Sequence, residues 1–335
     1  MRQSAPDDSA ENALPPKIVS PLRLAFRVLL LVACAGGIVY LFQRNPEALT
    51  KLLNVGPWIM AALGGLFVVE YPLQSVRYHV VLTKVAGVRI AFGEWFRLFV
   101  LGQWLNVFFP QLGNVYRGVQ LKKFHGVCYT GYISSYVAFA WVDTCINLAV
   151  TLAVLVAGGA GLTIAGMPAW GFVLTLLTAA ILVPAAMSAF LRLPIARSRR
   201  LAWAHAKASQ VAGGLRQSAV DVRYLARIAS LGVVAFAITT VMFGACFMGM
   251  GVPVSLPALA MFCALYKLSN YVIITPGNLG VLELGCAVLG EQLHVGMAAG
   301  LLACGMVRVA GYSALFVELD RGVQDDIINR TAHAL

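Results

Sequence analysis

The chain has 335 residues, of which 60% are apolar and 12% are charged. A soluble domain carries about a quarter charged residues, so this composition excludes a soluble globular protein and indicates an integral membrane protein. The apolar stretches are long and show no alternation of period two, which predicts an all-α protein and argues against a transmembrane β-barrel. The net charge of +11 is explained by basic cytoplasmic loops, without nucleic acid as a partner.

In chain order, residues 1–20 are polar and predict a disordered cytoplasmic tail, and residues 21–320 form the membrane domain. A second cytoplasmic tail covers residues 321–335. Within the membrane domain we expect about six full transmembrane helices. They are Leu22–Phe42, Trp58–Arg77, Cys128–Ala157, Ala169–Phe190, Ile228–Met250 and Gly296–Phe316.

Two further apolar stretches are interrupted by proline and glycine. Phe92–Arg117 is broken around Pro110, and Leu256–Gly290 is broken around Pro276. Proline lacks the N–H that a helix needs, and glycine has no conformational preference to hold the helix together. Inside a membrane, irregular backbone persists where protein or trapped water covers it, so paired broken segments indicate a transporter-like binding region.

Loop charges predict how the two broken segments enter the membrane. Lys84 and Arg89 precede the first segment and Lys122 and Lys123 follow it, so both of its ends are expected on the cytoplasmic side. The second segment follows the uncharged turn 251–257 and is expected to enter from outside. The sequence therefore predicts two oppositely inserted re-entrant helical hairpins, an inverted-repeat-like arrangement with both termini inside.

The segment Arg192–Arg227 contains eight basic residues against the single acid Asp221. Its apolar residues recur at helical spacing, which predicts an amphipathic helix lying on the anionic phospholipid surface of the cytoplasmic leaflet. A solvated loop that only sets the topology remains the alternative.

Two motifs carry a resemblance to a known family. They are Pro110-x-x-Gly113-x3-Arg117 and the run Pro276–Glu283, which reads Pro-Gly-Asn-Leu-Gly-Val-Leu-Glu. Both resemble the transmembrane, flippase-like domain of bacterial lysylphosphatidylglycerol synthases, and the resemblance covers about Leu22–Leu319. It implies a helical domain that moves a lipid or lipid-linked sugar between the leaflets of the bacterial inner membrane.

The resemblance also sets limits. In the full-length synthases a soluble aminoacyl-transferase domain follows the membrane domain, whereas this chain ends shortly after its last span, so we expect a stand-alone member without that activity. The family often carries a Glu-Arg pair in the span after the first hairpin. Here the corresponding run, Phe139-Ala140-Trp141-Val142-Asp143, keeps Asp143 as its single ionisable residue.

Arg117 and Glu283 are the leading candidates for substrate binding, because an unpaired charge at membrane depth is costly. We expect the hairpins to meet near the midplane, with Arg117 facing an anionic lipid phosphate and Glu283 as its resting counter-ion. The half-helices that begin after Gly113 and Gly280 would add backbone N–H groups for the same anion. The alternative is an interfacial arginine and an ordinary helix cap.

Asp143, Lys267 and Arg308 are further candidates by the same cost argument. Asp143 could instead form a structural ion pair with Arg308 or with Lys267, and this alternative stays open. The amides of Asn114 and Asn278, like those of Asn106 and Asn270, flank the breaks. They could satisfy freed backbone groups or contact a headgroup.

Glu70 and Arg77 share a helix face, and Arg77 is expected to extend to the membrane interface. The seven cysteines form no C-x-x-C pair, and the sequence has no H-E-x-x-H, Walker-type or G-x-S-x-G motif. We therefore predict no cofactor, no metal and no hydrolytic chemistry.

The leading hypothesis is a translocase of an anionic lipid or a lipid-linked glycan intermediate, working by alternating access. One alternative is a membrane-embedded transferase acting on a polyprenyl-phosphate or a phospholipid headgroup. Another is an accessory subunit that docks a partner glycosyltransferase or lipid-modifying enzyme through Arg192–Arg227.

Overall fold

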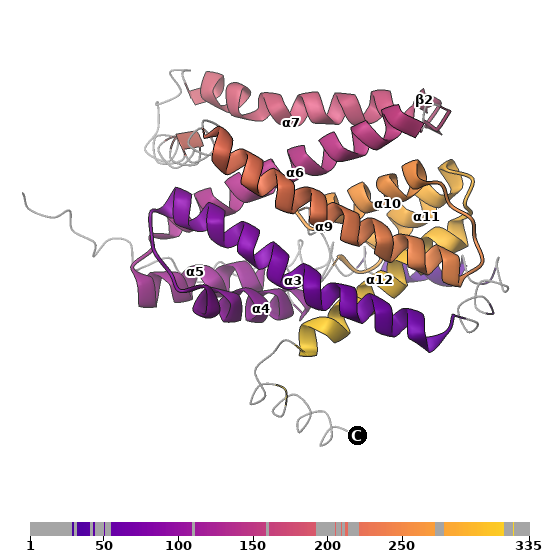
Figure 1. The fold of residues 1–335 in the computed structure, drawn as a ribbon, viewed down its shortest axis with the longest axis horizontal. Coiled ribbons are helices and arrows are strands. Elements are labelled where there is room, and N and C mark those ends of the chain that lie inside the picture. Colours follow the sequence, from indigo (N-terminus) through magenta and orange to yellow (C-terminus); the bar gives the residue numbers. More distant parts are fainter. Residues whose placement is uncertain are drawn as a thin grey trace, which may run out of the picture.

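The computed structural model describes residues 29, 32–40, 43, 50, 55–108, 111–158, 161–191, 205, 209, 212–213, 221–271, 278–317 and 324. Its helices and strands are shown in Figure 1. In chain order they are α3 Pro57–Ala86, α4 Phe92–Phe108, α5 Leu112–His125, α6 Tyr129–Gly158, β1 Thr163–Ile164, β2 Met167–Pro168, α7 Ala169–Leu191, α9 Val222–Gly249, α10 Leu256–Ser269, α11 Val281–Gln292 and α12 Met297–Val317. The predicted tail 1–20, most of the predicted tail 321–335, most of 192–220 and the hairpin tips 109–110 and 272–277 lie outside the described residues.

Among the described residues, five helices are long and apolar enough to cross a membrane: α3, α6, α7, α9 and α12. They coincide with five of the six predicted spans, so the prediction of an all-α integral membrane protein is confirmed. Of the sixth predicted span, Leu22–Phe42, the structure describes residues 32–40 as helical, together with the isolated residue 29.

Several predicted boundaries were wrong. Helix α3 continues past Arg77 to Ala86, so Arg77 lies inside the helix and not at its end. Helix α9 begins at Val222, six residues before the predicted start, because Asp221 caps it by accepting a hydrogen bond from the Tyr224 backbone N–H at 3.1 Å. Residues 222–227 of the basic segment therefore belong to a long helix. The connection between α6 and α7 contains a two-stranded hairpin, β1–β2.

The helices of the two broken segments are shorter than the five long helices. Helices α4 and α5 have 17 and 14 residues, and α10 and α11 have 14 and 12. At 1.5 Å per residue they extend about 18–25 Å, less than the roughly 30 Å of a hydrocarbon core. Each broken segment is thus a pair of short helices.

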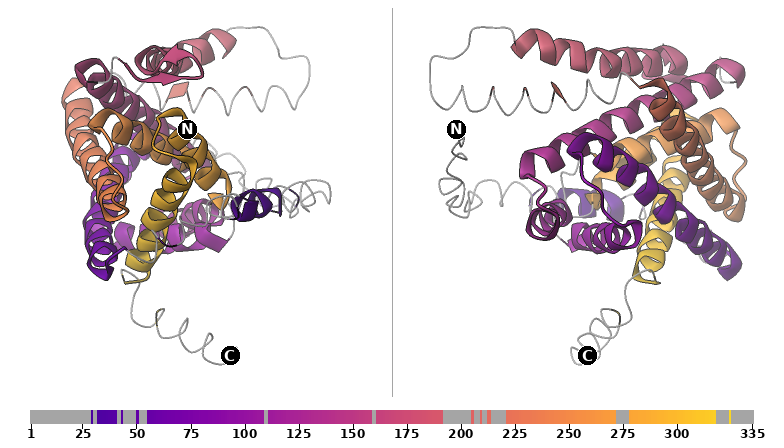
Figure 2. Two further views of the ribbon diagram at one scale, coloured as in Figure 1. Left: turned by 90° about the vertical axis from the view of Figure 1, so that its right-hand side faces the viewer. Right: turned by 60° about the vertical axis from the view of Figure 1, so that its left-hand side comes forward.

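The two short pairs open at opposite ends of the bundle (Figures 1 and 2). At the open end of the first pair, His125 Nε2 lies 3.2 Å from Glu94 Oε1, and the end of α3 meets the start of α9 through the ion pair Lys84–Asp221. At the open end of the second pair, Gln292 Oε1 accepts a hydrogen bond from the backbone between β1 and β2. The broken ends of both pairs therefore point towards the middle of the bundle.

The order long, short, short, long occurs twice, in α3–α4–α5–α6 and in α9–α10–α11–α12. Apolar packing crosses this division. One cluster contains Tyr78 and Trp95 and draws residues from α3, α4, α5, α6 and α9, and a larger one contains Phe243 and Phe262 and draws residues from α3, α6, α7, α9, α10, α11 and α12. Helices α3, α6 and α9 contribute to both clusters and so join the two halves.

Candidate functional site

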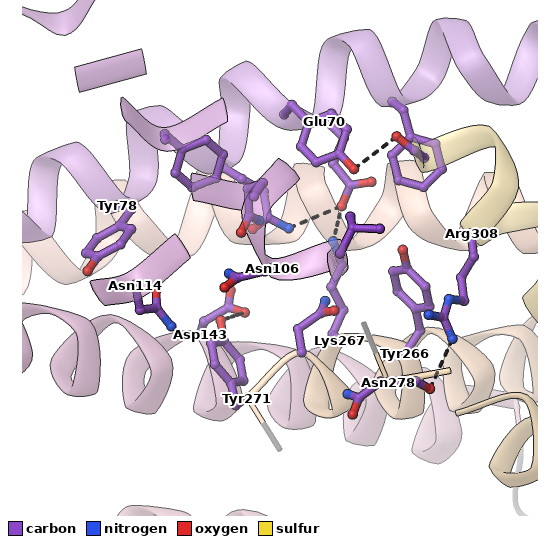
Figure 3. A pocket seen from close by; sticks show the side chains of 18 of the residues that line it. Glu70, Tyr78, Asn106, Asn114, Asp143, Tyr266, Lys267, Tyr271, Asn278 and Arg308 are labelled. Atoms are coloured by element: carbon purple, nitrogen blue, oxygen red, sulfur yellow. Dashed lines mark hydrogen bonds and ion pairs between the residues drawn. The ribbon is translucent and has the colours of Figure 1, made fainter. Parts of the chain in front are cut away.

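A polar cavity of about 180 Å³ lies where the two broken segments meet. Figure 3 shows side chains from both halves pointing into it, with Tyr78 and Asn114 at one end and Asn278 and Arg308 at the other. The structure therefore brings both segments to one site. The charged and amide side chains that line it are Glu70, Gln74, Gln103, Asn106, Asn114, Arg117, Asp143, Lys267, Asn270, Asn278 and Arg308.

The predicted counter-ion arrangement of Arg117 and Glu283 was wrong. Glu283 forms an ion pair with Arg308, with 2.5 Å between Oε1 and Nη1. Its other oxygen, Oε2, accepts the backbone N–H of Gly280 at 2.8 Å and caps the start of α11. This pair joins α11 to α12, so it stabilises the second half of the protein from within.

The predicted pairs of Asp143 were also wrong. Asp143 on α6 pairs with Arg77 on α3, and Lys267 on α10 pairs with Glu70 on α3. Arg77 is 1% exposed and does not extend to the interface as expected. Helix α3 is longer than predicted, so Arg77 lies well before its end and the nearest counter-charge is inside the bundle.

Arg117 is the buried cation that lies outside these pairs. It is 2% exposed, and its hydrogen bonds go to the Gly113 carbonyl oxygen at 3.2 Å, to Asn114 Oδ1 at 3.0 Å and to Gln103 Oε1 at 3.4 Å. The guanidinium also lies 5.4 Å from the ring centre of Phe99. All of these partners are neutral, and within the described ranges no carboxylate lies within ion-pair distance of Arg117.

A close backbone approach positions Arg117. A Cβ atom at Gly113 would overlap the carbonyl oxygen of Gly102 on α4, and a Cβ at Gly102 would lie 2.5 Å from Arg117 Nε. Asn106 Oδ1 accepts the Gly113 backbone N–H at 2.8 Å, so the amide satisfies a backbone group freed by the break. Because Gly102 and Gly113 have no side chains, α4 and α5 can pack closely together next to Arg117.

The second break is built differently. Gly280 has a φ of 83°, and a Cβ there would overlap Cys34, so both conformation and space require glycine. The side chain of Asn278 donates to the Ser269 carbonyl, and the Asn278 carbonyl accepts a bond from Arg308 at 3.1 Å. The backbone N–H groups of Gly113 and Gly280 are each accepted by a side chain of the protein, so the expected N–H donors for an anion are left to the residues that follow them.

Several cavity residues were missed from the sequence. Glu70, Gln74 and Tyr78 recur at intervals of four on α3 and all line the cavity. This spacing is typical of one helix face and could have identified a polar stripe on an otherwise apolar span. Gln103 was missed because it has no unusual feature in the sequence of α4.

Residues 24–317 match the family model described as the lysylphosphatidylglycerol synthase TM region. The chain belongs to this family. No solved structure matches the chain. Five described helices are long and apolar enough to cross a membrane, and together with the family match they identify the chain as a multi-pass membrane protein. The family points to a lipid-related function.

The size of the cavity limits what this TM-region protein can hold. Drug-sized ligands need pockets of roughly 300–1,000 Å³, so a space of about 180 Å³ suits a polar headgroup and not whole acyl chains. Amide and guanidinium donors around this space provide hydrogen bonds for an oxyanion.

Proposed function

We propose that this protein translocates an anionic lipid, or a lipid-linked glycan intermediate, across the bacterial cytoplasmic membrane, and that Arg117 binds the lipid phosphate. The buried, unpaired charge of Arg117 is the observation that carries this proposal. An isolated cation in a low-dielectric interior is costly, and an arriving phosphate removes that cost. The planar guanidinium fork matches phosphate oxygens better than an ammonium group does.

The charge balance of the cavity supports an anionic substrate. Arg77, Lys267 and Arg308 are each neutralised by a carboxylate, which leaves the single positive charge of Arg117. A phosphodiester headgroup carries one negative charge, so its binding neutralises the site. The neutral side chains around Arg117 hold the guanidinium in place by hydrogen bonds and do not neutralise its charge.

The opposite openings of the two short pairs support alternating access. We propose that α4–α5 opens to the cytoplasm and α10–α11 to the outside, with both termini cytoplasmic. The exposed Arg223 and Arg227 lie in the first turns of α9, at the end where α4–α5 opens. This supports contact of the Arg192–Arg227 segment with anionic phospholipid. Membrane-impermeant thiol reagents should label Lys122→Cys and Glu291→Cys from opposite sides, and labelling from one side would refute this topology.

Reconstitution in liposomes with NBD-labelled phosphatidylglycerol tests the proposed function. Wild-type protein should make the probe accessible to dithionite from both leaflets, and Arg117→Gln should reduce the rate towards that of protein-free vesicles. Arg117→Lys should retain part of the activity, because it keeps the charge and loses the fork. Arg97→Gln is the matched control, because Arg97 is exposed and does not line the cavity.

The outcomes separate the proposal from its alternatives. Wild-type rates in Arg117→Gln would overturn the role of Arg117. Chemical conversion of the probe would indicate a membrane-embedded transferase. Neither movement nor conversion would leave an accessory subunit for a glycosyltransferase or lipid-modifying enzyme, and would refute translocation of this lipid class.

A further inference from the structure

The ion pair Glu70–Lys267 has hydrogen-bonding capacity left over. Glu70 is 3% exposed, and its Oε1 accepts bonds from Lys267 Nζ, from Thr239 Oγ1 at 3.1 Å and from Gln74 Nε2 at 3.4 Å. Its Oε2 is buried and has no hydrogen-bond partner in the described part of the chain. Both Glu70 and Lys267 line the cavity. One carboxylate oxygen inside the proposed lipid site is therefore unused.

The other two buried carboxylates differ in this respect. Both oxygens of Asp143 and both oxygens of Glu283 already accept at least one hydrogen bond, so a proton added to either oxygen would weaken a bond that it makes. The partners are Arg77, Tyr271 and Asn147 for Asp143, and Arg308 and the Gly280 N–H for Glu283. Glu70 is thus the carboxylate of the cavity that can bind a proton on a vacant oxygen.

Lys267 is placed to be drawn away from Glu70. Figure 3 shows it in the middle of the cavity, between Asn114, which accepts a bond from Arg117, and Arg308 at the far end. Its ammonium group has three donor hydrogens, and Glu70 is its one hydrogen-bond partner in the residues described. Arg117 already donates hydrogen bonds from Nε and Nη2 to neighbouring groups. A phosphodiester bound there would take further donors from Lys267.

We propose that Glu70 is a proton-binding site coupled to lipid movement. This inference rests on the proposed translocation. When the lipid phosphate recruits Lys267, the carboxylate of Glu70 loses its counter-ion in a buried site, and it binds a proton from water. The new O–H bond forms on Oε2, and Lys267 stays an ammonium ion. The lipid anion and the proton then cross together without net charge.

Other titratable and charged groups surround Glu70. Most of them are already paired, or belong to the phenols and the thiol, side chains that are uncharged in water at neutral pH. They are Tyr71 and Tyr78 on α3, Arg117 on α5, Tyr136 and Asp143 on α6 with Arg77 as the partner of Asp143, Cys263, Tyr266 and Lys267 on α10, Tyr271 just after α10, and Arg308 and Tyr312 on α12. Helices α4 and α9 contribute the neutral Gln103, Asn106 and Thr239.

Proton uptake on lipid binding tests the proposal directly. Purified protein in a weakly buffered detergent solution is mixed with dihexanoyl-phosphatidylglycerol, and a pH indicator counts protons while binding is measured in parallel. We expect about one proton per bound lipid for the wild type and none for Glu70→Gln. Glu94→Gln is the matched control and should keep the wild-type stoichiometry, because Glu94 lies outside the cavity and is exposed.

A gradient experiment on the wild type gives a second test that needs no variant. In liposomes with the membrane potential clamped at zero, NBD-phosphatidylglycerol should accumulate in the leaflet facing the higher pH, up to about tenfold per pH unit for one coupled proton. Binding without proton uptake, or an even distribution across the gradient, would overturn the proton site and leave the proposed function intact. Absence of binding and of movement would refute both.

Discussion

Replacing Gly113 by alanine should separate α4 from α5 and disturb Arg117 without changing any charge. A Cβ at this position would overlap the Gly102 carbonyl oxygen and lie 2.5 Å from the carbonyl carbon, and Asn106 Oδ1 would be 2.9 Å away. Non-bonded carbon atoms prefer about 3.5–4.0 Å, so the two backbones must move apart by about 1 Å or more. The obstacle is a backbone group, which cannot turn aside as a side chain can.

The expected cost has two parts. Overpacking of a well-packed interior typically costs about 1–3 kcal/mol, and a collision between two backbones should lie at the upper end of that range. The gain in helix propensity from glycine to alanine, about 1 kcal/mol, offsets some of it. Movement of α5 also displaces the Gly113 carbonyl, which accepts the Arg117 Nε bond at 3.2 Å. Lipid movement should therefore fall even in protein that remains folded.

Unfolding can be followed with a thiol-reactive dye, because Cys34, Cys246, Cys263, Cys286 and Cys304 are buried free thiols that become reactive when the fold opens. The apparent Tm of the alanine variant in detergent should drop, and its NBD-phosphatidylglycerol movement should slow.

Gly93→Ala is the matched control, because no atom lies within 4 Å of a Cβ built at that position of α4. We expect it to match the wild type in both measurements. A Gly113 variant that melts and transports like the wild type, or a Gly93 variant that is equally damaged, would refute the close approach.

Two further predictions concern charged pairs. Asp143→Asn leaves Arg77 buried without its carboxylate, which should cost about 3–5 kcal/mol and lower the apparent Tm, and adding Arg77→Met should recover part of the loss. At the end of the bundle, the hydrogen bond from Lys84 lowers the pKa of Asp221. A lowered pKa means that the ionised carboxylate stabilises the fold at pH values above its unfolded pKa of about 3.9, and this stabilisation is lost as the pH falls through the pKa in the folded state. The apparent Tm should therefore change less between pH 6 and pH 3 in Asp221→Asn than in the wild type.

Sequence reasoning identified the elements better than it identified their partners. Five spans and the two pairs of short helices follow from apolar length, from proline and glycine positions and from loop charge. Six of the predicted site residues line one cavity, namely Asn114, Arg117, Asp143, Lys267, Asn278 and Arg308, whereas Glu283 does not line it. Ion-pair partners did not follow, because each pair joins helices whose rotation about their axes depends on packing across the bundle. Arg77 illustrates this: its partner Asp143 is 66 residues away.

Glycine contacts were equally inaccessible. The spacing of Gly296 and Gly300 is common in a chain with 32 glycines and carries little information alone. In the structure a Cβ at Gly300 would overlap the carbonyl oxygen of Cys286, and a Cβ at Gly290 would lie 2.6 Å from the Gly296 oxygen. The residue that makes the pattern meaningful, Gly290, lies on the neighbouring helix α11. A one-dimensional pattern cannot include it.

The three buried ion pairs divide by their place in the repeated architecture. Arg77–Asp143 lies within the first half, between α3 and α6, and the pair formed by Glu283 lies within the second half, between α11 and α12. Glu70–Lys267 alone among these three connects the halves, from α3 to α10. In the proposed alternating access the halves would rock against each other, so the pairs within a half would move as rigid bodies and the connecting pair would be strained. Substrate binding and rocking would then act on the same contact. A proton on Glu70 would remove the penalty of breaking this contact, which connects the proposed proton binding physically to the conformational step.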